Sequence, residues 1–209
     1  MYKILKKETL NPAVKLMVVE APHIAKKALA GQFIILRINE NGERIPLTIA
    51  DYDREKGTVT IIFQEVGKTT QMLGALNEGD CILDFVGPLG KPTEYEDDLK
   101  KVAVIGGGLG TAIAYPQAKQ LHNMGVDVDV IAGFRNKDLI ILEKEMKEVS
   151  NRLFITTDDG SNGQKGFVSD VLKNLIDEGT KYDLVIAIGP LIMMKVICNL
   201  TKEYGIKTI

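Results

Sequence analysis

The stretch KVAVIGGGLGTAIAYP, residues Lys101–Pro116, decides the fold of this chain. An apolar run typical of a strand buried on both faces leads into a group of glycines and then into a helical pattern. Such a loop lies at the carboxyl edge of a parallel sheet, where ligands bind. Glycines there let the backbone approach a phosphate closely, and the helix N-terminus offers free N–H groups. We therefore expect phosphate binding by Gly106, Gly107, Gly108 and Gly110.

The loop departs from the strict dinucleotide-binding pattern G-x-G-x-x-G. Thr111 stands at the third glycine position, and no acidic residue ends the second predicted strand, which runs into Arg135 and Asn136. A purely structural tight turn is therefore an alternative explanation of the glycines. Phosphate binding is the hypothesis that the strand–glycine–helix order favours.

From residue 101 onward, strands and helices alternate. We expect strands at 101–107, 127–134, 152–160, 182–190 and 206–209. The helices between them are expected at 111–125, 138–149, 169–179 and 191–205, with Ser169 as an N-cap and Gly179 as a stop signal. This pattern predicts a five-stranded, doubly wound parallel α/β domain that binds a nucleotide. The chain ends inside the fifth predicted strand, and we expect a longer natural protein at least as readily as a natural end there.

Two further strand ends face the same edge of the predicted sheet. Thr157, Asp158 and Asp159 follow the third strand, and Gly189 and Pro190 follow the fourth. Each aspartate is expected either to contact a ribose or to serve as a turn residue. Acidic groups there would disfavour a 2′-phosphate, whereas Arg135 would favour one. Both NAD and NADP therefore stay open.

Residues 1 to about 95 have the pattern of a small antiparallel barrel or sandwich. Short β-branched runs separated by turn residues occupy 13–22, 31–39, 45–53, 57–67 and 79–87. One helix is expected at residues 69–76, capped by Thr69 or Thr70. The charged segment 94–101 then suggests a domain boundary, which gives domains 1–97 and 98–209.

The composition excludes several classes of protein. The 26 basic and 28 acidic residues nearly cancel to a net charge of −2, so we expect neither nucleic acid nor an anionic membrane as a partner. The longest apolar segments are too short to be a membrane span, and residues 1–14 contain no apolar run of signal-peptide length, so we expect neither feature. Cys81 and Cys198 are isolated, which favours the cytoplasm and gives no metal site.

Several motifs together resemble the ferredoxin–NADP reductase superfamily over essentially the whole chain. They are GERIPLTIADYD, FQEVGKTTQML, GPLG, GGGLGTAIAYP, TTDDGSNGQKGFV and IGPLIMM. Within this superfamily, the chain is similar to electron-transfer subunits of the dihydroorotate dehydrogenase type. It is more similar still to small (alpha) subunits of NADH-dependent ferredoxin:NADP oxidoreductase, also described as sulfide dehydrogenase subunits. The resemblance implies an FAD-binding barrel followed by an NAD(P)-binding domain.

The resemblance also implies roles for residues of the barrel. The strand containing Pro46, Leu47 and Thr48 would line the flavin, with Thr48 as the catalytic hydroxyl near flavin N5. Ile62, Phe63 and Gln64 would touch the ribityl and adenosine side. Gly67, Thr69 and Thr70 would hold the FAD pyrophosphate. In the second domain, the cofactor-binding set would be Gly106, Gly107, Gly108, Gly110, Thr111, Arg135, Asp158, Asp159, Gly189 and Pro190.

This sequence departs from the family pattern at several positions. Ile45 stands where the family usually has the phosphate-binding Arg, and Arg44 lies one residue earlier, on the opposite strand face unless a bulge re-aims it. Leu47 replaces the aromatic residue that stacks on the flavin in many members. Ile113 replaces a proline that commonly follows the glycine loop.

The resemblance implies a redox function without acid–base machinery. The family's electron-transfer subunits continue into a cysteine-rich segment that holds a [2Fe–2S] cluster, which two cysteines cannot bind. We expect an FAD subunit that exchanges hydride with NAD(H) and serves a larger flavin or iron–sulfur subunit linked to ferredoxin. The alternatives are an electron-transfer subunit of dihydroorotate dehydrogenase and a nucleotide-binding or docking module without redox function.

Overall fold

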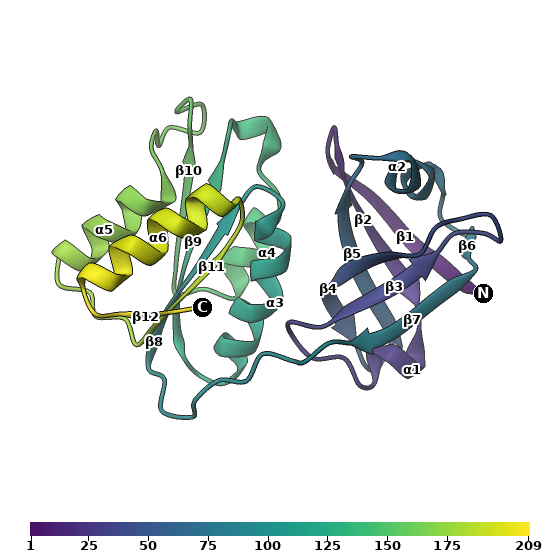
Figure 1. Cartoon of the computed structure of the whole chain (residues 1–209), viewed down its shortest axis with the longest axis horizontal. Coiled ribbons are helices and arrows are strands. Elements are labelled where there is room, and N and C mark those ends of the chain that lie inside the picture. Colours follow the sequence, from purple (N-terminus) through teal and green to yellow (C-terminus); the bar gives the residue numbers. More distant parts are fainter. The chain divides into compact units, whose positions relative to one another are not determined.

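The computed structural model describes all 209 residues, and they form two compact units. Unit 1 comprises Met1–Glu94 and unit 2 comprises Tyr95–Ile209 (Figure 1). The division falls at the start of the charged segment 94–101. Two residues just beyond it belong to unit 2 through their side chains. The Tyr95 hydroxyl donates a hydrogen bond to Gln117 Oε1, and Glu96 pairs with Lys207 at 2.5 Å.

Unit 1 is a nearly closed antiparallel barrel, as the sequence predicts. Seven strands follow one another in the order β6-β1-β2-β5-β4-β3-β7. Their bounds are β1 Tyr2–Asn11, β2 Val14–Glu20, β3 Phe33–Arg37, β4 Ile45–Asp53, β5 Thr58–Gln64, β6 Cys81–Ile82 and β7 Asp84–Leu89. The two edge strands, β6 and β7, are neighbours in the chain, so the sheet curls back on itself (Figure 1).

Alternating side chains of the strands fill the barrel. Met17 and Val19 of β2, Ile34 and Leu36 of β3, and Phe63 of β5 are almost completely buried in one apolar cluster. Burial of each such side chain contributes about 1.5–3 kcal/mol. The period of two in the sequence is therefore the property that specifies this core.

Three details of unit 1 differ from the sequence-based expectation. The sequence pattern predicts no strand at β1, because its lysines and glutamate leave only Ile4 and Asn11 buried. The expected strand 79–87 is divided at Leu83, whose N–H donates to Ile38 O at 3.1 Å. A second short helix, α1 (Pro22–Ala25), begins at a proline, where the missing N–H costs nothing.

Unit 2 is the predicted doubly wound domain. Its five parallel strands have the order β10-β9-β8-β11-β12. The strand bounds are β8 Lys101–Gly107, β9 Asp127–Phe134, β10 Arg152–Thr157, β11 Leu184–Ile188 and β12 Lys207–Thr208. The helices are α3 Gly110–Asn123, α4 Glu143–Glu148, α5 Val168–Asp177 and α6 Leu191–Glu203. Helices α5 and α6 cover one face of the sheet, and α3 and α4 cover the other (Figure 1).

Two expectations about helix limits in unit 2 were wrong. The single helix expected at 138–149 is a 3₁₀ turn at Lys137–Leu139 followed by α4, because Leu142 adopts a left-handed φ of 56° that interrupts the helix. Phe167, rather than Ser169, is the N-cap of α5, and its N–H donates to Asp170 Oδ2 at 3.1 Å. The stop at Gly179 is confirmed, since α5 ends at Asp177 and Gly179 has φ 97°.

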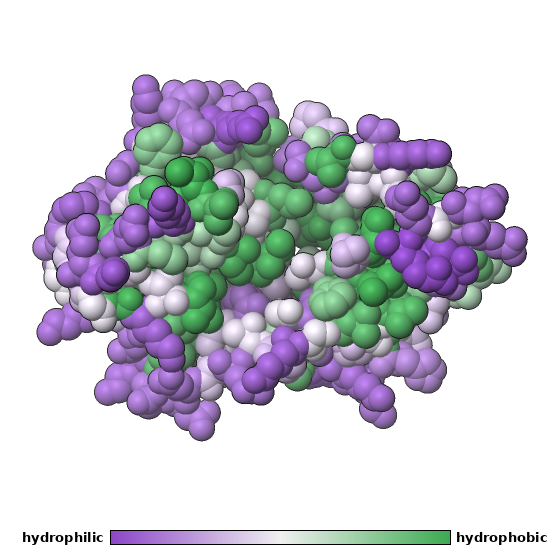
Figure 2. Space-filling model, viewed as in Figure 1, coloured by the Kyte–Doolittle hydropathy of each residue, from purple (hydrophilic) through white to green (hydrophobic).

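The surface of unit 2 carries exposed apolar side chains among its charges. Figure 2 shows apolar atoms interrupting the charged surface over α5 and α6. The large exposed apolar residues of these helices and their starts are Phe167, Leu191, Ile192 and Val196. No helix of the chain combines the length and the apolar character needed to span a membrane.

Candidate functional site

The predicted glycine loop lies at the topological switch point of the unit 2 sheet. β8 and β11 are hydrogen-bonded neighbours, but β8 continues into α3 on one face and β11 continues into α6 on the other. The two loops therefore diverge at the carboxyl ends of these strands. Ligands of open α/β sheets bind in the crevice that such a divergence creates.

Three of the loop glycines are explained by close packing. A Cβ on Gly107 would lie 2.6 Å from Met193 Sδ and 2.9 Å from Pro190 Cδ, and a Cβ on Gly110 would lie 2.8 Å from Gly189 Cα. A Cβ on Gly106 would lie 2.8 Å from Thr111 Cα. Gly107 and Gly110 thus let the loops after β8 and β11 pack against each other, and Gly106 lets the start of α3 pack against the end of β8.

Gly108 differs from its neighbours in this loop. It has φ 55°, a left-handed conformation that side chains disfavour, and no protein atom lies within 4 Å of the position of its absent Cβ. The predicted residues of the two loops, Gly106, Gly107, Gly108, Gly110, Gly189 and Pro190, are thus brought together at one edge. Thr111 is completely buried, and its Oγ1 has no hydrogen-bond partner.

The ends of β9 and β10 bring Arg135 next to the two predicted aspartates. The backbone N–H of Asp158 donates to Phe134 O at 3.0 Å, and that of Asp159 donates to Arg135 O at 3.4 Å. The side chains of Arg135, Asp158 and Asp159 are all exposed. Two acidic candidates and one basic candidate for the ribose end of a nucleotide therefore lie on neighbouring segments.

The two aspartates have different roles in the loop. Asp159 Oδ1 accepts a hydrogen bond from Ser161 N at 2.9 Å, and the hydrogen bonds with Ser161 lower the pKa of Asp159. Ser161 Oγ in turn accepts from Lys137 N at 2.8 Å. Asp159 is thus used in the turn, which is one of the two roles that the sequence allows, and its neighbour Asp158 is exposed.

In the barrel, β4 separates its predicted site residues by face. Ile45 and Leu47 pack against the barrel core, whereas Pro46 is exposed and Thr48 is half-buried on the alternate positions. Thr48 pairs with Phe33 of β3. The side chain of Leu47 therefore packs on the core side of β4, opposite Pro46 and Thr48.

Arg44 lies just before β4 and forms an ion pair within the barrel. Its Nη2 is 3.3 Å from Asp84 Oδ2, and Arg37 Nε donates to the same oxygen at 2.7 Å. Asp84 therefore already provides a counter-charge for Arg44.

The residues at the end of β5 also differ in which face of the strand they occupy. Phe63 is 1% exposed and belongs to the barrel core, so its backbone is the part of this residue that a ligand can contact. Ile62 is also buried, and Gln64 is exposed. The barrel core takes every second residue of a strand, so the side chains of Ile62 and Gln64 lie on the opposite face of β5 from Phe63.

The turn before helix α2 (Lys68–Ala75) contains Gly67, Thr69 and Thr70. Gly67, rather than Thr69 or Thr70, is the N-cap. Thr70 Oγ1 accepts hydrogen bonds from Val66 N and Gly67 N and donates to Gly67 O, each at 3.0 Å. The predicted cap was wrong because Thr70 closes the turn backward from the third helical position, as in a capping box.

Neither backbone conformation nor packing requires a glycine at position 67. Its φ of −153° is extended backbone that any residue adopts, and no atom lies within 4 Å of an added Cβ. A side chain at this position would instead project into open space beside the first turn of α2. That turn has N–H groups which Gly67, without a side chain, cannot cap. The arrangement fits a phosphate group that approaches the backbone.

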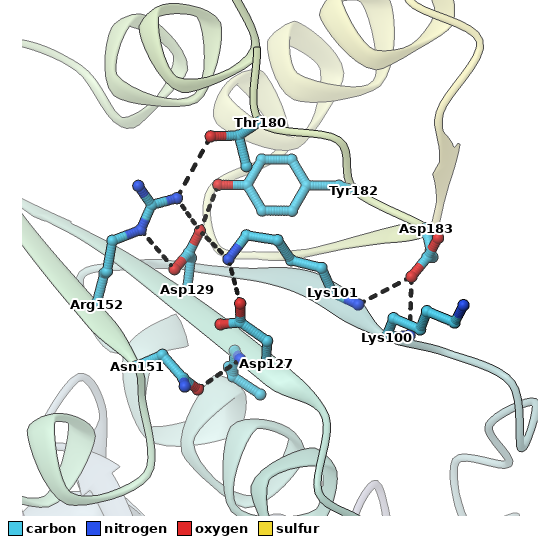
Figure 3. A network of polar contacts seen from close by, with 10 residues as sticks. Lys100, Lys101, Asp127, Asp129, Asn151, Arg152, Thr180, Tyr182 and Asp183 are labelled. Atoms are coloured by element: carbon cyan, nitrogen blue, oxygen red, sulfur yellow. Dashed lines mark hydrogen bonds and ion pairs between the residues drawn. The ribbon is translucent and has the colours of Figure 1, made fainter. Parts of the chain in front are cut away.

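A buried charge cluster lies at the other, amino edge of the unit 2 sheet, and the sequence reading missed it. Asp129 of β9 is completely buried (Figure 3). It accepts hydrogen bonds from Arg152 Nε at 2.9 Å, Arg152 Nη2 at 2.5 Å and the Tyr182 hydroxyl at 2.7 Å. Lys101 Nζ lies 3.4 Å from Asp129 and 2.6 Å from Asp127.

The cluster holds Asp129 in its charged form. Burial by itself would raise the pKa of Asp129, but hydrogen bonds from Arg152 and Tyr182 and the nearby positive charges outweigh it, so the pKa is lowered. An aspartate inside an otherwise apolar strand, as in DVDVIAGF, was the available signal. The cluster lies far along the strands from the glycine loops and ties β8, β9 and β10 together.

Comparisons with known proteins bear on both units. Residues 1–95 match the family model of the oxidoreductase FAD-binding domain. A Clostridium beijerinckii protein known by its place in the adh 3′ region is 55% identical over 215 residues, covering 100% of this chain and 73% of the relative. A Thermotoga maritima homologue of the dihydroorotate dehydrogenase B (NAD(+)) electron transfer subunit is 43% identical over 204 residues, covering 98% and 71%.

This chain belongs to the family of dihydroorotate dehydrogenase B electron-transfer subunits and their homologues. Among solved structures, a chain of the NADH-dependent reduced ferredoxin–NADP oxidoreductase superposes with a TM-score of 0.91 at 41% identity. The alignment covers 100% of this chain and 74% of that one. The family resemblance expected from the motifs is confirmed, and with it the assignment as a flavin-dependent oxidoreductase subunit.

Proposed function

We propose that this chain is an FAD-containing electron-transfer subunit that exchanges hydride with NAD(H) and passes electrons to an iron–sulfur partner subunit. The observation that carries the proposal is the joining of a barrel that matches an FAD-binding domain to a doubly wound domain with a glycine loop at its switch point. Each unit supplies a site suited to one of two cofactors.

The barrel residues fit FAD. The open position beside Gly67 and the first turn of α2 are suited to the FAD pyrophosphate. In this proposal Thr70 shapes that turn and Thr69 faces the phosphates. Pro46 and Thr48, on the outward face of β4, lie along the flavin, and the Thr48 hydroxyl provides a hydrogen bond near its reactive nitrogen. Arg44, which is paired with Asp84, contributes less to phosphate binding than the arginine that the family usually has at the position of Ile45.

The unit 2 residues fit a pyridine dinucleotide. The proposed pyrophosphate site lies at the loops that carry Gly108, Gly189 and Pro190, where the helices α3 and α6 begin. Asp158 accepts hydrogen bonds from the adenosine ribose and disfavours a 2′-phosphate, whereas Arg135 works in the opposite direction. We therefore propose NAD as the preferred dinucleotide, with NADP a weaker ligand.

FAD, when bound, supplies the ability to take two electrons as hydride and to release them singly. The chain positions the cofactors and needs no catalytic acid or base of its own. The partner we propose is a larger flavin or iron–sulfur subunit, linked to ferredoxin as in the NADH-dependent reduced ferredoxin–NADP oxidoreductase. The unpaired cysteines, Cys81 and Cys198, favour the cytoplasm as its location.

A visible spectrum of the purified chain tests this proposal. A yellow protein whose flavin bands are bleached by anaerobic NADH faster than by NADPH is the expected result. A chain that neither retains FAD nor regains it on reconstitution would instead be a nucleotide-binding or docking module without redox function.

The second candidate function is electron transfer to or from a dihydroorotate dehydrogenase, because several relatives are named as electron transfer subunits of that enzyme. Isolation of the natural complex distinguishes the two. A co-purifying subunit that oxidises dihydroorotate supports the second candidate, and a ferredoxin-dependent subunit supports the first.

A further inference from the structure

The linker that joins the two units is attached to unit 1 as far as Thr93. The Thr93 N–H donates a hydrogen bond to Ala30 O at 3.0 Å, and Ala30 is only 3% exposed. The next residue, Glu94, forms an ion pair with Lys91 at 3.5 Å. Both side chains of that pair are exposed, so the pair holds the backbone only weakly. Thr93 is thus the last residue that unit 1 holds firmly.

The side chain of Tyr95 makes the first attachment of the linker to unit 2. Its hydroxyl donates a hydrogen bond to Gln117 Oε1, and Gln117 is 4% exposed in the middle of α3. Burial raises the pKa of Tyr95 above its ordinary value of 10.0, so the hydroxyl keeps its proton and remains a donor. A single residue, Glu94, therefore separates the last firm attachment to unit 1 from the first attachment to unit 2.

Without the Tyr95 bond, the joint between the units would be much longer. The next backbone attachment to unit 2 comes at Lys100, whose N–H donates to Asp183 Oδ2 at 2.8 Å. Between these points Glu96 forms an ion pair with β12, but that pair is exposed and weak. The free segment would therefore extend over residues 94–99, and every added residue brings two rotatable backbone dihedral angles.

We propose that Tyr95 and Gln117 are positioning residues for hydride transfer, an inference that rests on the proposed function. Each cofactor is proposed to bind within one unit, whereas hydride transfer requires the reacting atoms to come within about 3–3.5 Å. The rate therefore depends on how freely the joint turns. Because α3 carries Gln117 and begins at the glycine loop, the Tyr95 bond attaches the joint to the helix that presents the proposed dinucleotide site. A joint confined to Glu94 limits the orientations that the units must search.

The cysteines of the chain allow the joint to be measured directly, without a cofactor. Cys81 lies in unit 1 and Cys198 lies in unit 2, and both are free and exposed. Spin labels attached to them in the flavin-free full-length chain report the distribution of distances between the units by double electron–electron resonance. The variants are Tyr95→Phe and Gln117→Met, because each removes one end of the hydrogen bond and keeps a side chain of similar size.

Two further variants calibrate this measurement. Tyr204→Phe is the matched control, because its hydroxyl bonds to Asp177 Oδ1 at 2.5 Å rather than to the linker or its partner. An insertion of glycines directly after Glu94 lengthens the joint and changes no side chain of either unit. We expect Tyr95→Phe, Gln117→Met and the insertion each to broaden the distance distribution, and Tyr204→Phe to leave it as in the wild-type chain.

The second measurement separates positioning from binding. With FAD bound, flavin reduction at saturating NADH should be about tenfold slower in Tyr95→Phe and in Gln117→Met. The affinities for FAD and NADH should change by less than about twofold, because each proposed site lies within one unit. The double variant should be no slower than either single variant, since both remove the same bond.

The possible results distinguish this inference from the proposed function. Unchanged distances and rates in both substitutions would overturn the positioning role while leaving the flavin function intact, and so would a rate loss matched by an equal loss of NADH affinity. If a substitution misfolds, the glycine insertion still decides, because an unchanged reduction rate there would overturn the role. A wild-type chain that binds FAD but is not reduced by NADH would overturn the proposed function and this inference together.

Discussion

Arg152 donates two hydrogen bonds to the completely buried carboxylate of Asp129, at 2.9 Å and 2.5 Å, across the pairing of β10 with β9. The pair is joined by Tyr182 and Lys101, so a single buried charge connects residues from four segments of unit 2 (Figure 3). The glycine loops lie at the opposite edge of the same strands. The amino edge of the sheet thus holds the buried charge, and the carboxyl edge holds the proposed nucleotide site.

Arg152→Met should destabilise unit 2 by about 3 kcal/mol, because it leaves a buried carboxylate with fewer partners. Denaturant unfolding of the full chain measures the loss. Lys173→Met is the control, since Lys173 forms an exposed ion pair with Asp177 and such pairs contribute about 0.5 kcal/mol or less. Equal losses in the two variants would contradict the importance of the buried pair.

The stability that Asp129 provides should depend on pH. Its pKa in the folded chain lies below the ordinary value of 3.8, so folding favours the charged form. The contribution is then fully present above pH 3.8 and is lost as the pH falls through the lower folded value. The stability difference between the wild-type chain and Asp129→Asn should therefore narrow below pH 3.8, as unfolding curves at several pH values would show. A difference that is constant down to complete acid unfolding would disprove the linkage.

Gly110→Ala should disturb the junction between the loops after β8 and β11. The added Cβ would lie 2.8 Å from Gly189 Cα. Backbone atoms cannot move aside as easily as the end of a flexible side chain can. We expect a loss of about 3 kcal/mol from overpacking, together with weaker NADH binding measured by calorimetry. Unchanged stability in Gly110→Ala would show that the loop shifts freely.

Gly67→Ala should separate ligand binding from folding. No protein atom approaches the added Cβ, and the backbone conformation suits alanine. The flavin-free variant should keep its unfolding free energy within about 0.5 kcal/mol. Its affinity for FAD should fall about tenfold, because the methyl group occupies the space proposed for the pyrophosphate. Full FAD affinity in this variant would move the pyrophosphate away from Gly67.

Asp158→Ala should shift the preference between the two dinucleotides. Loss of the exposed negative charge removes repulsion of a 2′-phosphate next to Arg135, and the ratio of NADPH to NADH reactivity should rise about tenfold. Rates of flavin reduction at matched concentrations give this ratio. Asp159→Asn is the control: it keeps an oxygen to accept the Ser161 N–H and leaves Asp158 in place. If only the control shifts the ratio, the assignment of the two aspartates is reversed.

The architecture of both units could be predicted from the sequence because its signals are local. Apolar runs that end at glycine and alternate with helical patterns specify a parallel sheet, and alternating β-branched runs specify a barrel. The strand β8 and the glycine loop that follows it lie where KVAVIGGGLG predicts. The same local reasoning failed at Leu142, because a left-handed leucine inside a helical pattern leaves no signature in residue type.

Tertiary structure alone decided what the candidate site residues can contact. Phe63 and Leu47 turn toward the barrel core, since one face of each strand must be buried. Asp159 is used in a turn by Ser161, whereas its neighbour Asp158 is not. The contact of Gly107 with Met193 joins residues of β8 and α6, and the Asp129 cluster joins residues of β8, β9 and β10 with Tyr182 just before β11. Hydrophobic periodicity acts over a few residues, whereas these contacts depend on which strands become neighbours, and that is decided only when the whole sheet packs.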